Sequence, residues 1–254
     1  MTTKPTTTVA AAPTSLLEDM AWPEAERLLT PDAVVVVPLG ASAKEHGPHL
    51  RLSNDWILAD YLRRRLAERT PVVVAPIVGL SFYPAFVEYP GSISLGLDTA
   101  RAVLVEVVRS LARHGPRRFY ALNTGISTLR ALRPAAEALA AEGIVLRFTD
   151  LTTAIAPVEK QVAQQEGGTH ADELETSMML YIAPEAVDMS RAVKDYRPGD
   201  GPLTRRPEGP GVYSPTGSWG DPTLATRDKG ERLVRALIDA LVADVAALRA
   251  APLP

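Results

Sequence analysis

The chain has 254 residues, of which 46% are hydrophobic and 22% charged, with a formal net charge of -3 at pH 7. This length suits one sizeable α/β domain, and the charge argues against a nucleic-acid or anionic-membrane partner. The absence of cysteine excludes disulfides, thiolate metal ligands and a cysteine nucleophile.

The first 15 residues differ in composition from the rest. They are rich in Thr, Ala and Pro, and Lys4 is their only charged residue. No apolar h-region follows Lys4, so we expect a disordered tail and no signal peptide. Elsewhere no apolar run approaches the roughly 20 residues that span a bilayer. We therefore expect residues 16–254 to form one domain of a cytoplasmic enzyme.

The predicted elements alternate between apolar strands and amphipathic helices. We expect helices at 22–29, 55–68, 98–114, 129–141 and 229–250, and strands at 33–37, 72–75, 118–123 and 144–148. This alternation predicts an α/β fold of three layers, with a central, mostly parallel sheet flanked by helices.

Three irregular stretches interrupt this pattern, at 76–96, 161–168 and 194–211, and residues 217–222 extend the last of them. The first contains Tyr83 and Phe86, which would line a pocket beside the sheet or pack within their own loop. A loop as long as 194–211 in a compact domain is typically functional or disordered.

The first candidate site follows the strand at 33–37. Glu45, His46, His49 and Asp55 follow the Gly-containing turn that ends this apolar run, and ligands of such sheets collect past the carboxyl ends of the strands. His, Asp and Glu are the ligands of hydrolytic zinc, manganese or iron sites. Structural, hydrogen-bonded histidines are the alternative interpretation.

A second candidate group begins at Thr169. Thr169 and Asp172 could form a capping box at the start of a helix. On that helix His170 and Glu173 would stand one turn apart on the same side. The pattern therefore predicts a pair of bases or metal ligands at a helix start.

Three sequence blocks resemble the creatininase (creatinine amidohydrolase) family. They are Pro-Leu-Gly with His46-Gly47-Pro48-His49-Leu50 and Asp55, then 170–177 with the sequence HADELETS, and then 217–222 with the sequence GSWGDP. The resemblance implies an α/β sandwich, often assembled as a hexamer. It also implies a divalent-metal amidohydrolase that acts on a cyclic or linear amide.

The resemblance also implies a set of metal ligands. In the family pattern two metal ions share the aspartate that matches Asp55. One ion also binds a glutamate of the first block and the histidine of an Asn-Gly-His motif. The other binds the histidine that matches His46 and a carboxylate that matches Glu173.

This sequence departs from the pattern at both private ligands of one metal. An added residue before His46 places Lys44 at the glutamate position, and Gly125 stands where the motif has its histidine. Either the chain binds one metal and the Lys44 ammonium replaces the other cation, or a bulge brings Glu45 inward as a ligand. In the second case His49 or His170 would complete a second metal site.

The resemblance implies a role for each of the candidate site residues. The metal ligands are His46, Asp55 and Glu173, with Glu45 added in the second case; the catalytic residues are His170 as proton shuttle, Glu175 and Lys44; the pocket residues are His49, Tyr83, Phe86, Trp219 and Asp221. We expect one or two divalent ions per protomer, zinc ahead of manganese or iron, a small-molecule amide substrate and a homo-oligomer. The alternative is a non-catalytic binding or regulatory protein on the same scaffold.

Overall fold

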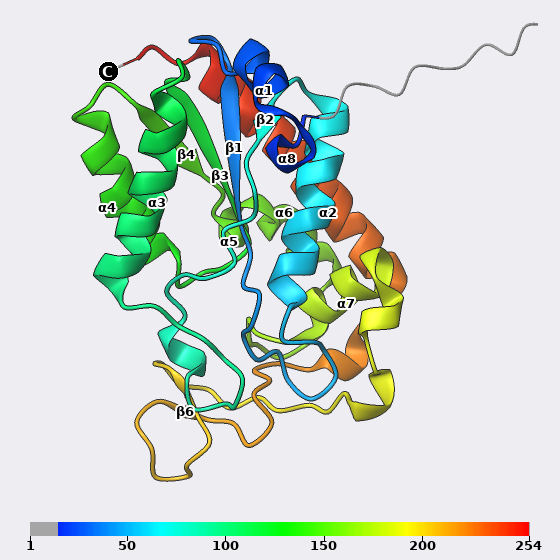
Figure 1. Ribbon diagram of the computed structural model, residues 1–254. Helices are drawn as coiled ribbons and strands as arrows, with labels where there is room; N and C mark the ends of the chain where they lie inside the picture. Colours follow the sequence, from blue (N-terminus) through cyan, green and yellow to red (C-terminus); the bar gives the residue numbers. More distant parts are fainter. Residues whose placement is uncertain (1–14, 254) are drawn as a thin grey trace, which may run out of the picture.

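A four-stranded parallel sheet forms the centre of the protein (Figure 1). The structure is a computed structural model that describes residues 15–253, so nearly all of the expected N-terminal tail lies outside the described residues. The strands are β1 (Val34–Leu39), β2 (Val73–Val74), β3 (Arg118–Asn123) and β4 (Val145–Phe148), in the order β2-β1-β3-β4. All six residues of β1 are buried, as expected of a strand covered on both faces.

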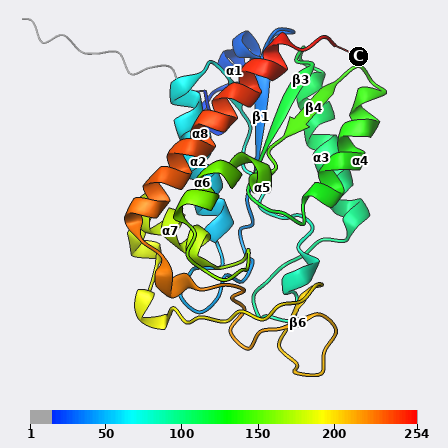
Figure 2. The same ribbon diagram turned by 180° about the vertical axis from the view of Figure 1, so that it is seen from behind.

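Helices cover both faces of the sheet (Figures 1 and 2). One core cluster joins Val34 and Val36 to α2 (Asn54–Arg69) and α8 (Arg227–Ala250). The other joins Val35 and Val37 to α3 (Leu97–Ala112) and α4 (Leu129–Ala140). Successive strand residues face opposite layers, and the predicted three-layer α/β fold is confirmed.

Several short elements were not predicted. α5 (Leu151–Ala154) and α6 (Ala156–Val162) follow β4, so the irregular stretch expected at 161–168 begins two residues later. The expected loop at 194–211 contains β5 (Leu203–Thr204), which pairs in parallel with β6 (Val212–Tyr213). The remaining elements are α1 (Trp22–Leu28) and the 3-10 helices η1 (Leu17–Asp19), η2 (Pro84–Phe86), η3 (Pro184–Ala186), η4 (Met189–Arg191) and η5 (Pro222–Leu224).

The start of α7 (Glu173–Ile182) differs from the prediction. Asp172 caps the helix through Oδ1, which accepts hydrogen bonds from the backbone N–H groups of Leu174 and Glu175. The expected capping box from Thr169 is therefore wrong. His170 lies before the helix, and Ala171 next to it has a φ of +47°, the one positive φ of a non-glycine residue between 15 and 253.

The long connections gather at the carboxyl end of the sheet, at the bottom of Figure 1. Gly40 turns the chain after β1, and a Cβ there would lie 2.4 Å from the backbone oxygen of Asp55 and 2.7 Å from Cβ of Ala59. Only glycine allows this approach to α2. The turn thereby holds Asp55 against the end of β1. Within residues 15–253 no helix combines the length and apolar character needed to cross a membrane.

Candidate active site

A cavity of about 660 Å³ opens at the carboxyl ends of the strands. Its wall includes Lys44 from the connection after β1, Phe86 from η2, His170 from the segment before α7, and Glu175 from the first turn of α7. This position relative to a parallel sheet is the one expected for a ligand site.

Asp55 connects Lys44 and His46. The Nζ atom of Lys44 lies 2.7 Å from Oδ2 of Asp55, and Nε2 of His46 lies 2.8 Å from Oδ1. All three residues are buried. Burial opposes ionisation of Asp55, but the adjacent Lys44 and His46 outweigh it and hold the pKa of the carboxyl well below its usual range. Burial likewise disfavours the Lys44 ammonium, but Asp55 and then Glu175 raise its pKa above the ordinary value.

His170 lies between two carboxylates. Its Nε2 donates a hydrogen bond of 2.8 Å to Oε1 of Glu45, and its Nδ1 lies 3.7 Å from Oε2 of Glu175. The other oxygen of Glu45 accepts from the backbone N–H of Gly47 at 2.9 Å. Burial opposes the charged forms of His170 and Glu45, but their mutual attraction exceeds it, so the pKa of His170 is raised and that of Glu45 is lowered.

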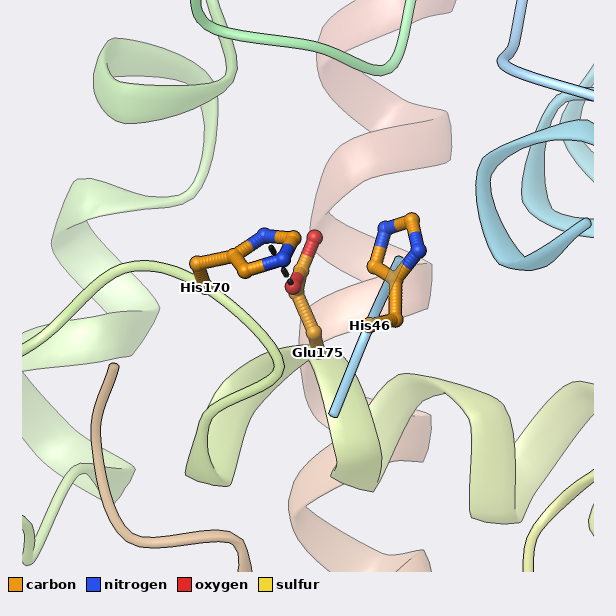
Figure 3. A group of neighbouring side chains, drawn as sticks. All are labelled: His46, His170 and Glu175. Carbon is orange, nitrogen blue, oxygen red and sulfur yellow. Dashed lines mark ion pairs between the residues drawn. The ribbon is translucent and has the colours of Figure 1, made fainter. Parts of the chain in front are cut away.

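The two histidines face each other across the cluster. Their ring centroids are 4.8 Å apart, and Figure 3 shows Glu175 rising from α7 between them. The Phe86 ring lies 4.2 Å from that of His170 and 4.8 Å from the Lys44 ammonium. Phe86 thus shields both groups from water and adds a cation–π contact to Lys44.

His46, His170 and Glu175 could hold a metal ion. One ligand atom from each lies within 4.8 Å of the others, slightly more than the roughly 4 Å that a zinc ion with bonds near 2.1 Å can bridge. Nδ1 of His170 and Oε2 of Glu175 are already 3.7 Å apart, within that reach.

The hydrogen bonds around the rings fit this use. The backbone carbonyl of Lys44 accepts from Nδ1 of His46 at 2.9 Å, and Glu45 accepts from Nε2 of His170. Metal-binding histidines usually donate their second N–H to such an acceptor. The second nitrogens are Nε2 of His46, which lies 2.8 Å from Oδ1 of Asp55, and Nδ1 of His170, which faces Glu175. In their deprotonated form both nitrogens are donors that suit a divalent cation.

The structure does not bring Glu173 to this cluster. Its Oε1 pairs with Lys229 of α8 at 2.5 Å, and its Oε2 accepts from the backbone N–H groups of Gln164 and Gln165. Both oxygens of this carboxylate therefore have partners on α8 or on the loop after α6. Glu175, not Glu173, is the carboxylate of α7 that lies beside His170.

The expected pocket residues divide into two groups. Phe86 and Trp219 line the cavity, whereas His49, Tyr83 and Asp221 do not. His49 is buried with Nε2 2.8 Å from Oγ1 of Thr176, and burial lowers its pKa to about 4. Asp221 caps η5, accepting from the backbone N–H of Thr223. Tyr83 is buried with its ring centroid 5.7 Å from Nζ of Lys44.

Asp172 is a site residue that the sequence analysis did not assign to the site. It lines the cavity, and burial together with Glu175 raises its pKa to about 7. A signal was present, because Asp172 and Glu175 have the spacing of a capping box ahead of an apolar run. The interpretation that began the helix at Thr169 obscured it.

Comparisons with known proteins agree with the fold and the sequence blocks. A family model described as creatinine amidohydrolase matches residues 18–245. A mycofactocin precursor peptide peptidase of Mycobacterium tuberculosis (strain ATCC 25618 / H37Rv) is 32% identical over 228 residues, covering 84% of each chain. A creatinine amidohydrolase of Pseudomonas putida is 28% identical over 245 residues, covering 88% of this chain and 93% of that one.

A solved structure of creatinine amidohydrolase (creatininase) superposes with a TM-score of 0.81 at 23% identity, over 95% of this chain and 100% of that chain. This likeness shows the shared fold, and the match of the family model extends over most of the sequence. The chain belongs to the creatininase family.

Proposed function

We propose that the protein hydrolyses an amide bond with the aid of one divalent metal ion, held by His46, His170 and Glu175 with Asp55 beside them. One observation carries the proposal: each imidazole has one nitrogen fixed by an acceptor, and the other nitrogen faces a carboxylate. This arrangement at the end of a cavity supplies both a cation site and room for a substrate.

The names of relatives support amide hydrolysis as the reaction. The matched proteins include a creatinine amidohydrolase and peptide peptidases, both of which cleave C–N bonds. Two solved creatininase structures with TM-scores of 0.78 and 0.79 are described as the Mn form and a mutant of the Zn-Zn type. The nitrogen and oxygen donors here favour zinc, with manganese or iron as alternatives.

The chain's own groups would prepare the substrate for attack. A bound divalent ion would lower the pKa of a water from 15.7 to near 7 and polarise a carbonyl. Lys44 lines the cavity and would offer its ammonium to the carbonyl oxygen as negative charge develops there. Glu45 fixes the orientation of the His170 ring, and Phe86 excludes water from both groups.

A matched pair of substitutions tests the site. Glu175→Gln should abolish hydrolysis of a panel of linear and cyclic amides and reduce the metal content. Glu173→Gln, the same change two residues away, should leave both unchanged apart from its effect on folding. Loss of metal in Glu173→Gln with retention in Glu175→Gln would contradict the proposed site.

The role of His170 has a separate test. His170 is a metal ligand in the proposed site, whereas the family resemblance implies a proton shuttle at this position. His170→Gln should lose the metal if the ring is a ligand. A variant that retains the metal and wild-type affinity for it, but loses turnover, would instead assign His170 to proton transfer.

The position of Lys44 favours a second candidate function, that of a non-catalytic binding protein. Its ammonium lies 2.7 Å from Asp55 and already neutralises the carboxylate that two metal ions would share in the family pattern. If wild-type protein bound no metal and cleaved no amide in the panel, this candidate would replace the hydrolase.

Two further expectations remain predictions. Cell fractionation would test the cytoplasmic location. Analytical ultracentrifugation would test the homo-oligomer, including the hexamer that the resemblance implies.

A further inference from the structure

The wall of the cavity continues from the charged cluster into the hydrophobic core. Leu58 of α2, Ile155 beside α6, and Leu174 and Met178 of α7 line the cavity and also belong to the core cluster on that face of the sheet. Leu151, partly buried at the start of α5, lines it too and packs against the same cluster. The cavity is therefore bounded by groups that are otherwise used for core packing.

The apolar part of the wall lies close to Glu175 along α7. Asp172 and Glu175 lie at the start of the helix, and Met178 follows Glu175 by three residues, about 4.5 Å along the helix axis. Leu174 and Met178 are separated by four residues, so they share one side of the helix. The apolar wall thus begins within one helical turn of the carboxylate proposed to hold the metal.

Such a wall is suited to an apolar group of a ligand. Water in a space lined by Leu, Ile and Met side chains finds few hydrogen-bond partners, so its replacement by hydrocarbon is favourable. The volume of about 660 Å³ is in the range of pockets that bury drug-sized ligands. It exceeds what an amide of a few heavy atoms would fill.

We propose that the substrate is an amide that carries a bulky apolar substituent, such as an aliphatic chain of about six carbons, and that this group occupies the wall formed by Leu58, Leu151, Ile155, Leu174 and Met178. This inference rests on the proposed function for the reacting bond. Binding of the apolar group is nevertheless measurable without any reaction.

Methyl ketones provide the binding probe, because they keep a carbonyl and lack the scissile C–N bond. Acetone, 2-butanone, 2-hexanone and 2-octanone would be titrated into the purified wild-type protein and followed by ligand-observed NMR. Affinity should rise about fourfold for each added methylene that is buried. The value of kcat/KM for the corresponding linear amides should rise in the same order.

A substitution that fills the cavity provides the second test. Leu151→Trp should weaken binding of 2-octanone at least tenfold. Leu111→Trp is the matched control, since Leu111 is also partly buried but packs against the core cluster on the other face of the sheet. If Leu151→Trp does not fold, judged by circular dichroism, Leu151→Ala should still weaken 2-octanone severalfold.

The outcomes separate the two proposals. Affinity that does not depend on chain length, or equal effects of Leu151→Trp and Leu111→Trp, would overturn the inference about the substrate. Binding that strengthens with chain length, without hydrolysis of any amide, would keep the apolar site and overturn the proposed reaction. Hydrolysis without a chain-length preference would keep the proposed reaction and overturn the apolar site.

Discussion

The ion pair between Glu173 and Lys229 should stabilise the fold without taking part in the chemistry. Glu173 is fully buried, and its carboxylate binds the Lys229 ammonium and two backbone N–H groups. The Glu173→Gln substitution preserves the shape of the side chain and removes its charge. It leaves Lys229 with the side-chain oxygen of Gln164 and the backbone oxygen of Leu224 as acceptors.

The expected loss follows from these contacts. Removal of one partner from a buried ion pair costs about 3–5 kcal/mol. Lys229 keeps two acceptors and its side chain is 13% exposed, so we expect a loss at or slightly below the lower end of that range, about 2–3 kcal/mol in the free energy of unfolding. Urea unfolding followed by circular dichroism measures this loss through the shift of the midpoint at constant slope.

Glu68→Gln is the matched control. Glu68 pairs with Arg65 at 2.8 Å, but its side chain is 59% exposed, and such pairs contribute about 0–1 kcal/mol. The reasoning would be refuted if Glu173→Gln lost no more stability than Glu68→Gln. Loss of metal or activity in folded Glu173→Gln would show that Glu173 belongs to the site after all.

Three further predictions concern buried groups around the site. Because burial lowers the pKa of His49 from 6.5 to about 4, the unfolded chain binds a proton between these pH values that the folded chain does not. Stability should therefore fall as the pH falls through this window, and His49→Gln should remove about 3 kcal/mol of that loss in urea titrations at pH 7 and pH 4. Gly217→Ala would place a Cβ 2.1 Å from Oε2 of Glu45 at a φ of +87°, so it should lower kcat at least tenfold by displacing Glu45; wild-type kcat would contradict this. Lys44→Met leaves the buried Asp55 carboxylate with the His46 ring as its remaining hydrogen-bond partner and should cost roughly 3 kcal/mol in urea unfolding; an unchanged midpoint would show that Lys44 does not stabilise Asp55.

The strands could be predicted well because their physical signal is local. The run of valines in β1 is apolar at every position, as a strand buried on both faces requires. β3 was predicted with its observed bounds, 118–123. The short helices α5 and α6 were not predicted, because helices of four and seven residues depend on packing against the rest of the protein.

The site was predicted less completely because side-chain direction depends on where α7 begins. His170 and Glu173 would share one side of a helix only if His170 were helical. The turn at Ala171 removes His170 from the helix, and the neighbouring carboxylate becomes that of Glu175. Glu173 pairs instead with Lys229, which lies 56 positions later in the sequence, and no local pattern reveals this contact.

Metal content tests the central claim most directly. Elemental analysis of wild-type protein purified without added metal should find about one divalent ion per protomer, and Glu175→Gln should lose it while Glu173→Gln retains it. No ion in the wild type, even after incubation with zinc, manganese or iron salts, would contradict a metal-dependent hydrolase. Two ions per protomer would contradict the single-metal site and indicate that Glu45 or another histidine completes a second one.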